Sequence, residues 1–145
     1  MKRFKFRLEK VLSLRKHHEQ EAKNELGRAI SILNLIDHNI RENAVKHNHA
    51  LQERFFGINQ SDGIRGIDDM YSWDNYILRL EQDAQRLAEE KEEAEKVMEE
   101  KRILYLEASR ELKIMENLKE KQEKEHRKEM FAVETKERDD KAQST

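Results

Sequence analysis

Apolar residues recur along most of this chain with the alternating three- and four-residue spacing of a coiled coil. Stepping in this way from Leu8 to Ile40 gives ten positions, of which eight are apolar. Stepping from Trp73 to Met115 gives thirteen positions, of which eleven are apolar. Such a register is typical of packed helices and not of a disordered chain, so the pattern predicts two long helical arms.

Both patterns weaken toward their ends. After Ile40 the apolar residues shift in phase, which predicts a seam (the stripe that faces the other helix) through Ala44, His47, Leu51 and Phe55. Past Met115 the second seam decays into polar residues, and the segment from Glu134 onward is almost wholly polar. We therefore expect the C-terminal tail to fray.

Helix breakers are confined to one place. The chain has no proline, which would interrupt a helix, and three of its four glycines are Gly57, Gly63 and Gly66. The sequence predicts one elongated coiled-coil domain, 1–145, with a hinge at 57–69. Its first arm covers about 4–56, its second about 70–135, and a frayed tail follows.

The two arms match in length, so the fold class predicted is all-α, an antiparallel coiled-coil hairpin. Folding back at residue 63 places residue i near residue 126 − i. A seam of this kind also serves an intermolecular dimer, and the pattern alone leaves that alternative open.

Charge is distributed unevenly along the chain. Charged residues make up 41 % of it and the net charge is −2. Residues 1–30 hold nine Lys and Arg against four Glu, whereas residues 71–100 hold four against ten Asp and Glu. The basic N-terminus and the acidic stretch after the hinge predict different partners for the two ends. No apolar run reaches the length of a membrane span or a secretory signal, and there is no cysteine.

No catalytic or ligand-binding constellation can be assembled from the sequence. His17 and His18 are adjacent and His47 and His49 are two apart, so neither pair shares a helix face. Phosphate-binding and calcium-binding loops are missing, and the paired glutamates fit a solvated helix surface. We therefore expect a protein that is not an enzyme, with no cofactor and no metal.

Two segments suggest docking. The N-terminal stretch of Lys2 to Leu8 interleaves basic and aromatic residues, which fits an anionic membrane surface, nucleic acid or, as we favour, a protein partner. Aromatic residues also cluster around the hinge, where two narrow seams cannot bury them all. They are Phe55, Phe56, Tyr71, Trp73 and Tyr76.

Two sequence motifs resemble a known family. The opening motif reads Phe4-x-Phe6-x-Leu8-x-x-Val11-Leu12-x-Leu14-Arg15, followed by Glu19, Glu21 and Ala22. The second reads Lys101-Arg102-x-x-Tyr105-x-Glu107-Ala108-x-Arg110-x-x-Lys113-x-x-Glu116-x-Leu118, and a looser match follows in Glu134-x-Lys136-x-x-Asp139-Asp140-x-Ala142. These motifs are similar to the FliJ family of flagellar type III export proteins.

This resemblance implies a stalk-like adaptor. Its partners would be the hexameric flagellar export ATPase, which receives the tip holding both termini, the export-gate membrane protein, and export chaperones, with no role for nucleic acid. The implied location is the cytoplasm, peripheral at the cytoplasmic face of the inner membrane through the export apparatus. We expect a monomer when free.

The resemblance also implies which residues meet each partner. The gate-facing residues would be Tyr76, Leu80, Asp83 and Leu87. Asp83 and Leu87 depart from the small and polar types expected of the family, and Leu80 and Leu87 fall on the predicted seam, so Tyr76 is the best single candidate. The ATPase-facing residues would be Phe4, Phe6, Leu8, Arg15, Arg102, Arg110 and Lys113.

Two other roles compete with this adaptor. One is a structural coiled-coil dimer that acts as a tether or scaffold without coupling to an ATPase. The other is an N-terminal segment that lies on a membrane surface.

Overall fold

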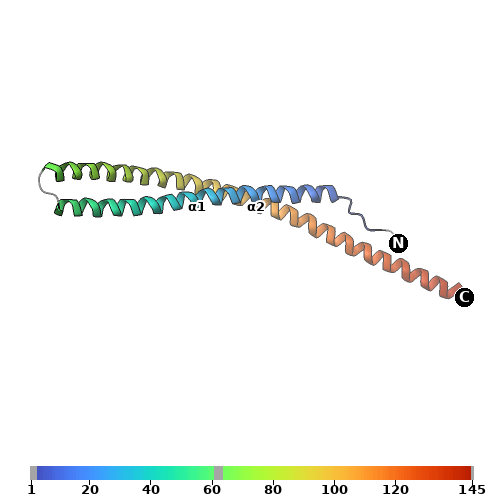
Figure 1. Cartoon of the computed structure of the whole chain (residues 1–145). Helices are drawn as coiled ribbons and strands as arrows, with labels where there is room; N and C mark the ends of the chain where they lie inside the picture. Colours follow the sequence, from blue (N-terminus) through green and yellow to red (C-terminus); the bar gives the residue numbers. More distant parts are fainter. Residues whose placement is uncertain (1–2, 61–63, 145) are drawn as a thin grey trace. The chain divides into compact units, whose positions relative to one another are not determined.

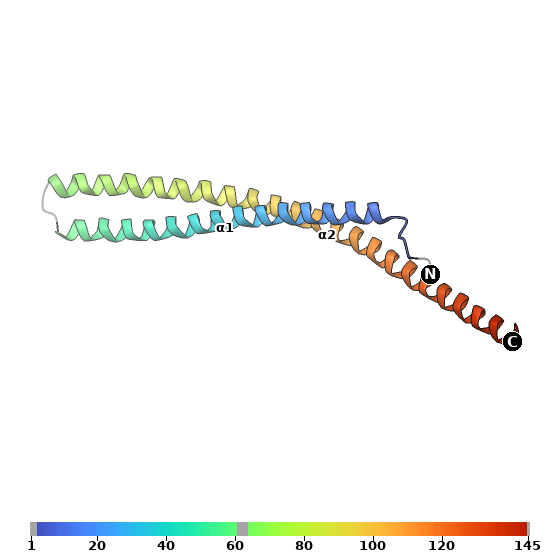
Figure 2. The ribbon, with the colours of Figure 1, turned by 45° about the vertical axis from the view of Figure 1, so that its right-hand side comes forward.

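The chain forms two helices that pack against each other in opposite directions. The computed structural model describes residues 3–60 and 64–144, in which α1 covers Glu9–Gln60 and α2 covers Ile64–Ser144. Figures 1 and 2 show the later part of α1, drawn cyan to green, side by side with the green to yellow beginning of α2 in both views. The predicted all-α antiparallel hairpin is therefore confirmed.

The helices start and end beyond the predicted limits on both sides of the hinge. Residues 57–60 and 64–69, expected in the hinge, are helical, and 61–63 lie outside the described residues. A helical glycine costs only about 1 kcal/mol relative to alanine, which a long helix can absorb. Extending a formed helix is easy compared with starting one, so Gly57 does not end α1.

The two outer ends also differ from the prediction. The first arm does not start near residue 4 but at Glu9, whose N–H donates to the Phe6 carbonyl at 3.2 Å. The second arm does not fray near residue 135 but stays helical to Ser144. Its final turns are rich in Glu, Lys, Arg and Ala, which are strong helix formers, and this explains the extension.

Contacts group the chain into two compact units. Unit 1 combines Met1–Asn24 with Ile103–Thr145, and unit 2 is Glu25–Arg102. The sequence's single elongated domain stays a prediction.

Ion pairs between the helices record their register. In unit 1, Lys119 Nζ lies 3.0 Å from Glu9 Oε2, and Arg15 Nη1 lies 2.6 Å from Glu111 Oε2. In unit 2 the paired residues are Glu25 with Lys101, Asp37 with Lys91, His47 with Glu81, and Arg54 with Asp74. Each pair of numbers adds to 126 or 128, which agrees with the predicted pairing of i with 126 − i.

The seam keeps its spacing on α1 where the sequence predicted a shift. After Ile40 it continues through Asn43, His47, Ala50 and Arg54, all buried or half-buried. The polar members find partners: Asn43 Nδ2 donates to the Leu80 carbonyl oxygen at 3.0 Å, and Arg54 pairs with Asp74. Because these partners compensate for desolvation, the polar residues can occupy the seam.

The predicted shifted seam is therefore wrong beyond Ile40, apart from His47. Ala44, Leu51 and Phe55 are exposed, although their apolar character had placed them inside. On α2 the predicted seam holds, and of its thirteen positions Ala84 is the one that is exposed. The core is thin: the nearly fully buried apolar side chains among the described residues are Phe6, Leu12, Ala29, Ala50, Ile77, Leu80 and Leu87.

Candidate partner-binding surfaces

All four predicted gate-facing residues line one groove of unit 2. The tyrosine groove, as we call it, has a volume of about 350 Å³ and is bordered by Tyr76, Leu80, Asp83 and Leu87 of α2 and by residues of α1 that include Lys46. The spacing of these four residues on α2 explains their convergence, because residues three or four apart share a helix face.

The four residues differ in their accessibility. Leu80 and Leu87 expose 6 % and 5 % of their surface, so they form the floor of the groove and hold the helices together. Tyr76 is half-buried and Asp83 is exposed. While the hairpin is closed, a partner can therefore contact Tyr76 and Asp83, whereas the two leucines are unavailable.

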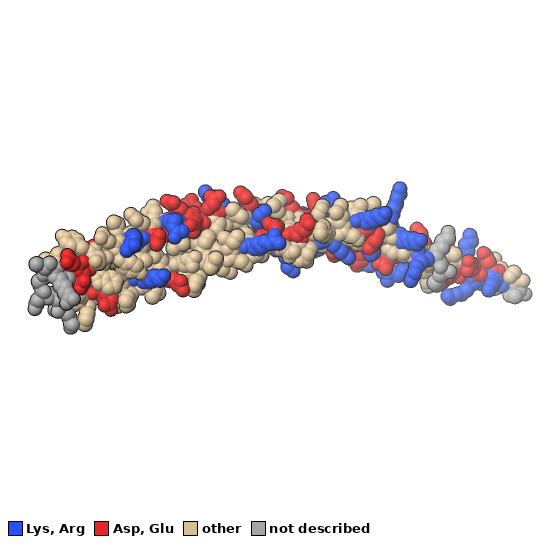
Figure 3. Space-filling view, turned by 45° about the horizontal axis from the view of Figure 1, so that its top comes forward, with Lys and Arg blue, Asp and Glu red and all other residues tan. Residues whose placement is uncertain are grey.

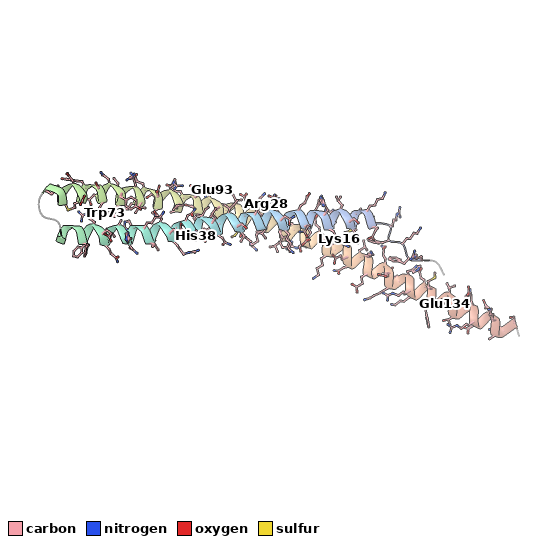
Figure 4. All side chains as sticks on the ribbon, viewed as in Figure 1. Lys16, Arg28, His38, Trp73, Glu93 and Glu134 are labelled. Atoms are coloured by element: carbon pink, nitrogen blue, oxygen red, sulfur yellow. The ribbon has the colours of Figure 1, made fainter. Side chains whose placement is uncertain are left out.

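Tyr76 is held in place by its neighbours. Its ring meets that of Trp73 edge to face, with the centroids 6.0 Å apart, and both rings pack against the buried cluster of Ala50, Ile77 and Leu80. Figure 4 shows Trp73 on the side of α2 that faces α1. An aromatic ring fixed in this way can bind a partner with little loss of side-chain entropy.

The other side of the seam carries a second groove that the sequence did not predict. This alanine groove, of about 390 Å³, is lined by Ile40, Ala44, Ala84 and Ala88, with His47, Asn48 and Glu81 at its edge. It shares Asn43 and Leu80 with the tyrosine groove. The signal in the sequence was the set of small residues at 44, 84 and 88, which the register brings together and which leave space unfilled.

In unit 1 the N-terminal segment packs on α2. The ring of Phe4 lies 5.5 Å from that of His126, and Phe6 is buried, exposing 8 % of its surface. Together with Glu9 and Lys119 they line a depression of about 550 Å³. The hairpin thus uses both phenylalanines to anchor its N-terminus.

The remaining predicted ATPase-facing residues fall into two groups. Leu8, Arg110 and Lys113 are exposed in unit 1, whereas Arg15 lies on the seam and pairs with Glu111. Arg102 belongs to unit 2, where it binds Glu99 with N–O distances of 2.6 and 2.9 Å. This hydrogen bond, with the charge of Arg102, lowers the pKa of Glu99. On the face drawn in Figure 3, Lys and Arg are frequent toward the end that carries the chain termini.

Histidines pair with glutamates one helical turn further along. His17 Nε2 lies 2.8 Å from Glu21 Oε1, and similar pairs join His38 to Glu42 and His49 to Glu53. Within residues 3–60 and 64–144, no group of three or more His, Asp or Glu residues is placed to hold a metal ion. No helix in this described part is both long and apolar enough to cross a membrane.

Comparison with protein-family models identifies the family of this chain. The family model described as "Flagellar FliJ protein" matches residues 4–145, which is nearly the whole chain. Searches of curated proteins and of solved structures gave no match. The chain therefore belongs to the FliJ family, which takes part in flagellar protein export.

Proposed function

We propose that this member of the FliJ family is an adaptor that joins the export ATPase ring to the export gate and carries out no catalysis itself. The single observation that carries the proposal is the family match over residues 4–145. The hairpin adds support, because its two narrow, mostly polar helices provide surfaces on which partners can dock. In this role the chain works in the cytoplasm, peripherally at the membrane through its partners, and also contacts export chaperones.

The ATPase contact is proposed to lie in unit 1. Arg110 and Lys113 are exposed there and lie three residues apart on α2, which puts them on one face. Leu8 adds an exposed apolar side chain beside the basic N-terminal segment. In this proposal Phe4, Phe6 and Arg15 act by holding the segment in position.

The gate contact is proposed to lie on the tyrosine groove of unit 2. Tyr76 supplies a fixed aromatic ring, and Asp83 and the neighbouring Arg86 supply a charged rim, with Arg86 Nη2 3.6 Å from Asp83 Oδ1. Aromatic residues surrounded by a polar rim are typical of binding hot spots. Leu80 and Leu87 shape the groove from below.

Hydrolysis of ATP by the cognate export ATPase tests this proposal. We expect the wild-type chain to promote ring assembly and to raise turnover, and the double variant Arg110→Glu/Lys113→Glu to lose most of this effect, since it reverses two exposed charges. Lys96→Glu is the matched control, because Lys96 is an exposed lysine of unit 2. Unchanged turnover at saturating wild-type chain would contradict the ATPase role.

The alternative is a coiled-coil dimer that acts as a tether. The long seam favours it, but in the hairpin each helix already covers the seam of the other. Sedimentation of the free chain separates the two: the adaptor proposal predicts a monomer at micromolar concentration, and a stable dimer would favour the tether.

A further inference from the structure

The two sides of the seam in unit 2 carry different residues. A residue that follows a seam position by one lies on the side of the alanine groove, as Ala44 and Ala88 do. A residue that precedes a seam position by one lies on the side of the tyrosine groove, as Lys46 and Tyr76 do. The rule holds for both helices, because an antiparallel pair brings matching positions to the same side.

The side of the alanine groove is apolar close to the junction of α1 and α2. Leu51 and Phe55 follow the seam residues Ala50 and Arg54, and Leu78 follows Ile77. Tyr71 follows Met70, a half-buried residue that continues the α2 seam before Trp73. Leu51, Phe55, Tyr71 and Leu78 are all exposed, with exposed fractions of 68 % for Phe55, 62 % for Tyr71 and 53 % for Leu78. We call these four residues, together with the alanine groove, the apolar flank.

The opposite side at the same level is charged. Lys46, Glu53, Arg79, Asp83 and Arg86 each precede a seam residue. The neighbours Phe55 and Phe56 therefore lie on different sides, although their exposed fractions are similar at 68 % and 57 %. Clustered exposed apolar side chains of this kind mark an interaction surface, and close to the junction four of them lie on the side of the alanine groove, whereas Phe56 lies on the other.

Acidic residues continue the apolar flank along α2. Glu81, Glu92 and Glu95 each follow a seam residue, and their side chains are 57 %, 73 % and 53 % exposed. On α1 the residues in corresponding places include Asn34, Asn48 and one arginine, Arg41. A partner on this flank therefore meets apolar side chains first and carboxylates along the α2 edge.

We propose that the apolar flank binds an amphipathic helix whose apolar stripe fills the groove and whose Lys or Arg residues lie over α2. A helix fits because the groove runs between two helices and small alanines allow close approach. Basic residues fit because residues 71–100 carry ten acids against four bases. The site is separate from the tyrosine groove, so two partners can bind unit 2 on opposite sides.

A synthetic peptide probes this site. The peptide has about 18 residues, or about five helical turns, with Leu at helical spacing and Lys elsewhere. Fluorescence anisotropy with the full chain should show saturable binding that weakens with salt. A second peptide with Glu in place of Lys should bind at least about tenfold more weakly, because its carboxylates would face the carboxylates of α2.

Variants of the chain locate the binding. Phe55→Ser and Leu78→Ser should each lower the affinity for the Lys peptide about tenfold, as expected for exposed apolar anchors. Phe56→Ser is the matched control, since it removes an equally exposed ring from the other side, and it should change the affinity less than about twofold. All three residues are exposed, so the fold should survive, which circular dichroism checks.

Three results would overturn the proposal. The first is that Phe55→Ser and Phe56→Ser weaken binding of the Lys peptide equally, and the second is that the Lys and Glu peptides bind with equal affinity. The third is self-association of the free chain that Leu78→Ser abolishes. The last result would assign the flank to a second copy of the chain. Because no ATPase or gate protein is present in this assay, its failure is separate from a failure of the proposed adaptor function.

Discussion

The α1 seam packs against α2 along its whole length, but its residues are mostly apolar before residue 41 and mostly polar after it. The earlier part uses Leu33, Ile36 and Ile40, whereas the later part uses Asn43, His47 and Arg54 together with one alanine. Both keep the same spacing and pair with α2 in the same register. Register is thus maintained by apolar burial in one part and by satisfied polar groups in the other.

The largest effect is expected in the apolar part. Leu87 is nearly fully buried at the level of Ile40, so Leu87→Asp places a carboxylate among apolar side chains at the floor of the tyrosine groove. We expect a loss of at least about 3 kcal/mol of unfolding free energy, combining lost burial and an unpaired charge. Urea unfolding followed by circular dichroism measures it. Tyr76→Ala, at a half-buried position, should keep the helix content; an equal loss in both variants would refute the seam assignment.

Substitutions in the polar part of the seam should change the unfolding free energy less than Leu87→Asp does. Asn43→Ala removes the hydrogen bond to the Leu80 carbonyl and should cost about 1 kcal/mol. Asn43→Leu should raise stability but weaken the choice of register and partner, because a seam asparagine specifies pairing at a cost in stability. Sedimentation should then show a larger dimer fraction for Asn43→Leu than for the wild-type chain at the same concentration. A strictly monomeric, destabilised Asn43→Leu would contradict this role.

The interhelical pair of Arg54 and Asp74 should contribute less again. Both side chains are partly exposed, so solvent screens their attraction. Arg54→Met, which keeps much of the aliphatic stem, should change the unfolding free energy by about 0.5 kcal/mol, and the effect should shrink in high salt. A double-mutant cycle with Asp74→Asn isolates the pair, and a coupling energy of zero would show that Arg54 acts through its stem alone.

The smallest effect is a pH dependence at Lys91. Its hydrogen bond to Asp37, and the charge of that carboxylate, raise the Lys91 pKa above 10.5. The stabilising contribution is therefore present below pH 10.5 and is lost as the pH rises through the raised value. Thermal melts across this alkaline range should show a small step that Lys91→Met lacks. An identical step in the variant would assign it to other groups.

Much of the fold could be predicted from the sequence, because the residues that pack between two coiled helices are apolar and recur at intervals of three and four. The α2 seam from Trp73 to Met115 and the pairing of i with 126 − i were both visible in this way. The shift after Ile40 was wrong because counting apolar residues assumes that Asn43 and Arg54 avoid the seam. Only the folded structure shows that Asn43 donates to a backbone carbonyl and that Arg54 pairs with Asp74.

The candidate surfaces were partly predictable for the same reason. The family resemblance named Tyr76 and Asp83, and the seam spacing already placed Leu80 and Leu87 inside, where the structure buries them. The apolar flank was predicted only in part. Phe55 and Tyr71 were among the hinge aromatics that the seams could not all bury, but Leu51 had been assigned to the seam and the groove beside it was not foreseen. The space beside Ala44 and Ala84 depends on both helices at once, which no local pattern records.

We propose that unit 2 meets the export gate through the tyrosine groove and not through the apolar flank. Binding of the gate's cytoplasmic fragment to the full chain, titrated by calorimetry, tests it most directly. We predict about tenfold weaker binding for Tyr76→Ala and wild-type affinity for Phe55→Ser. Wild-type affinity for Tyr76→Ala, combined with weaker binding of Phe55→Ser, would contradict this proposal and assign the gate contact to the apolar flank.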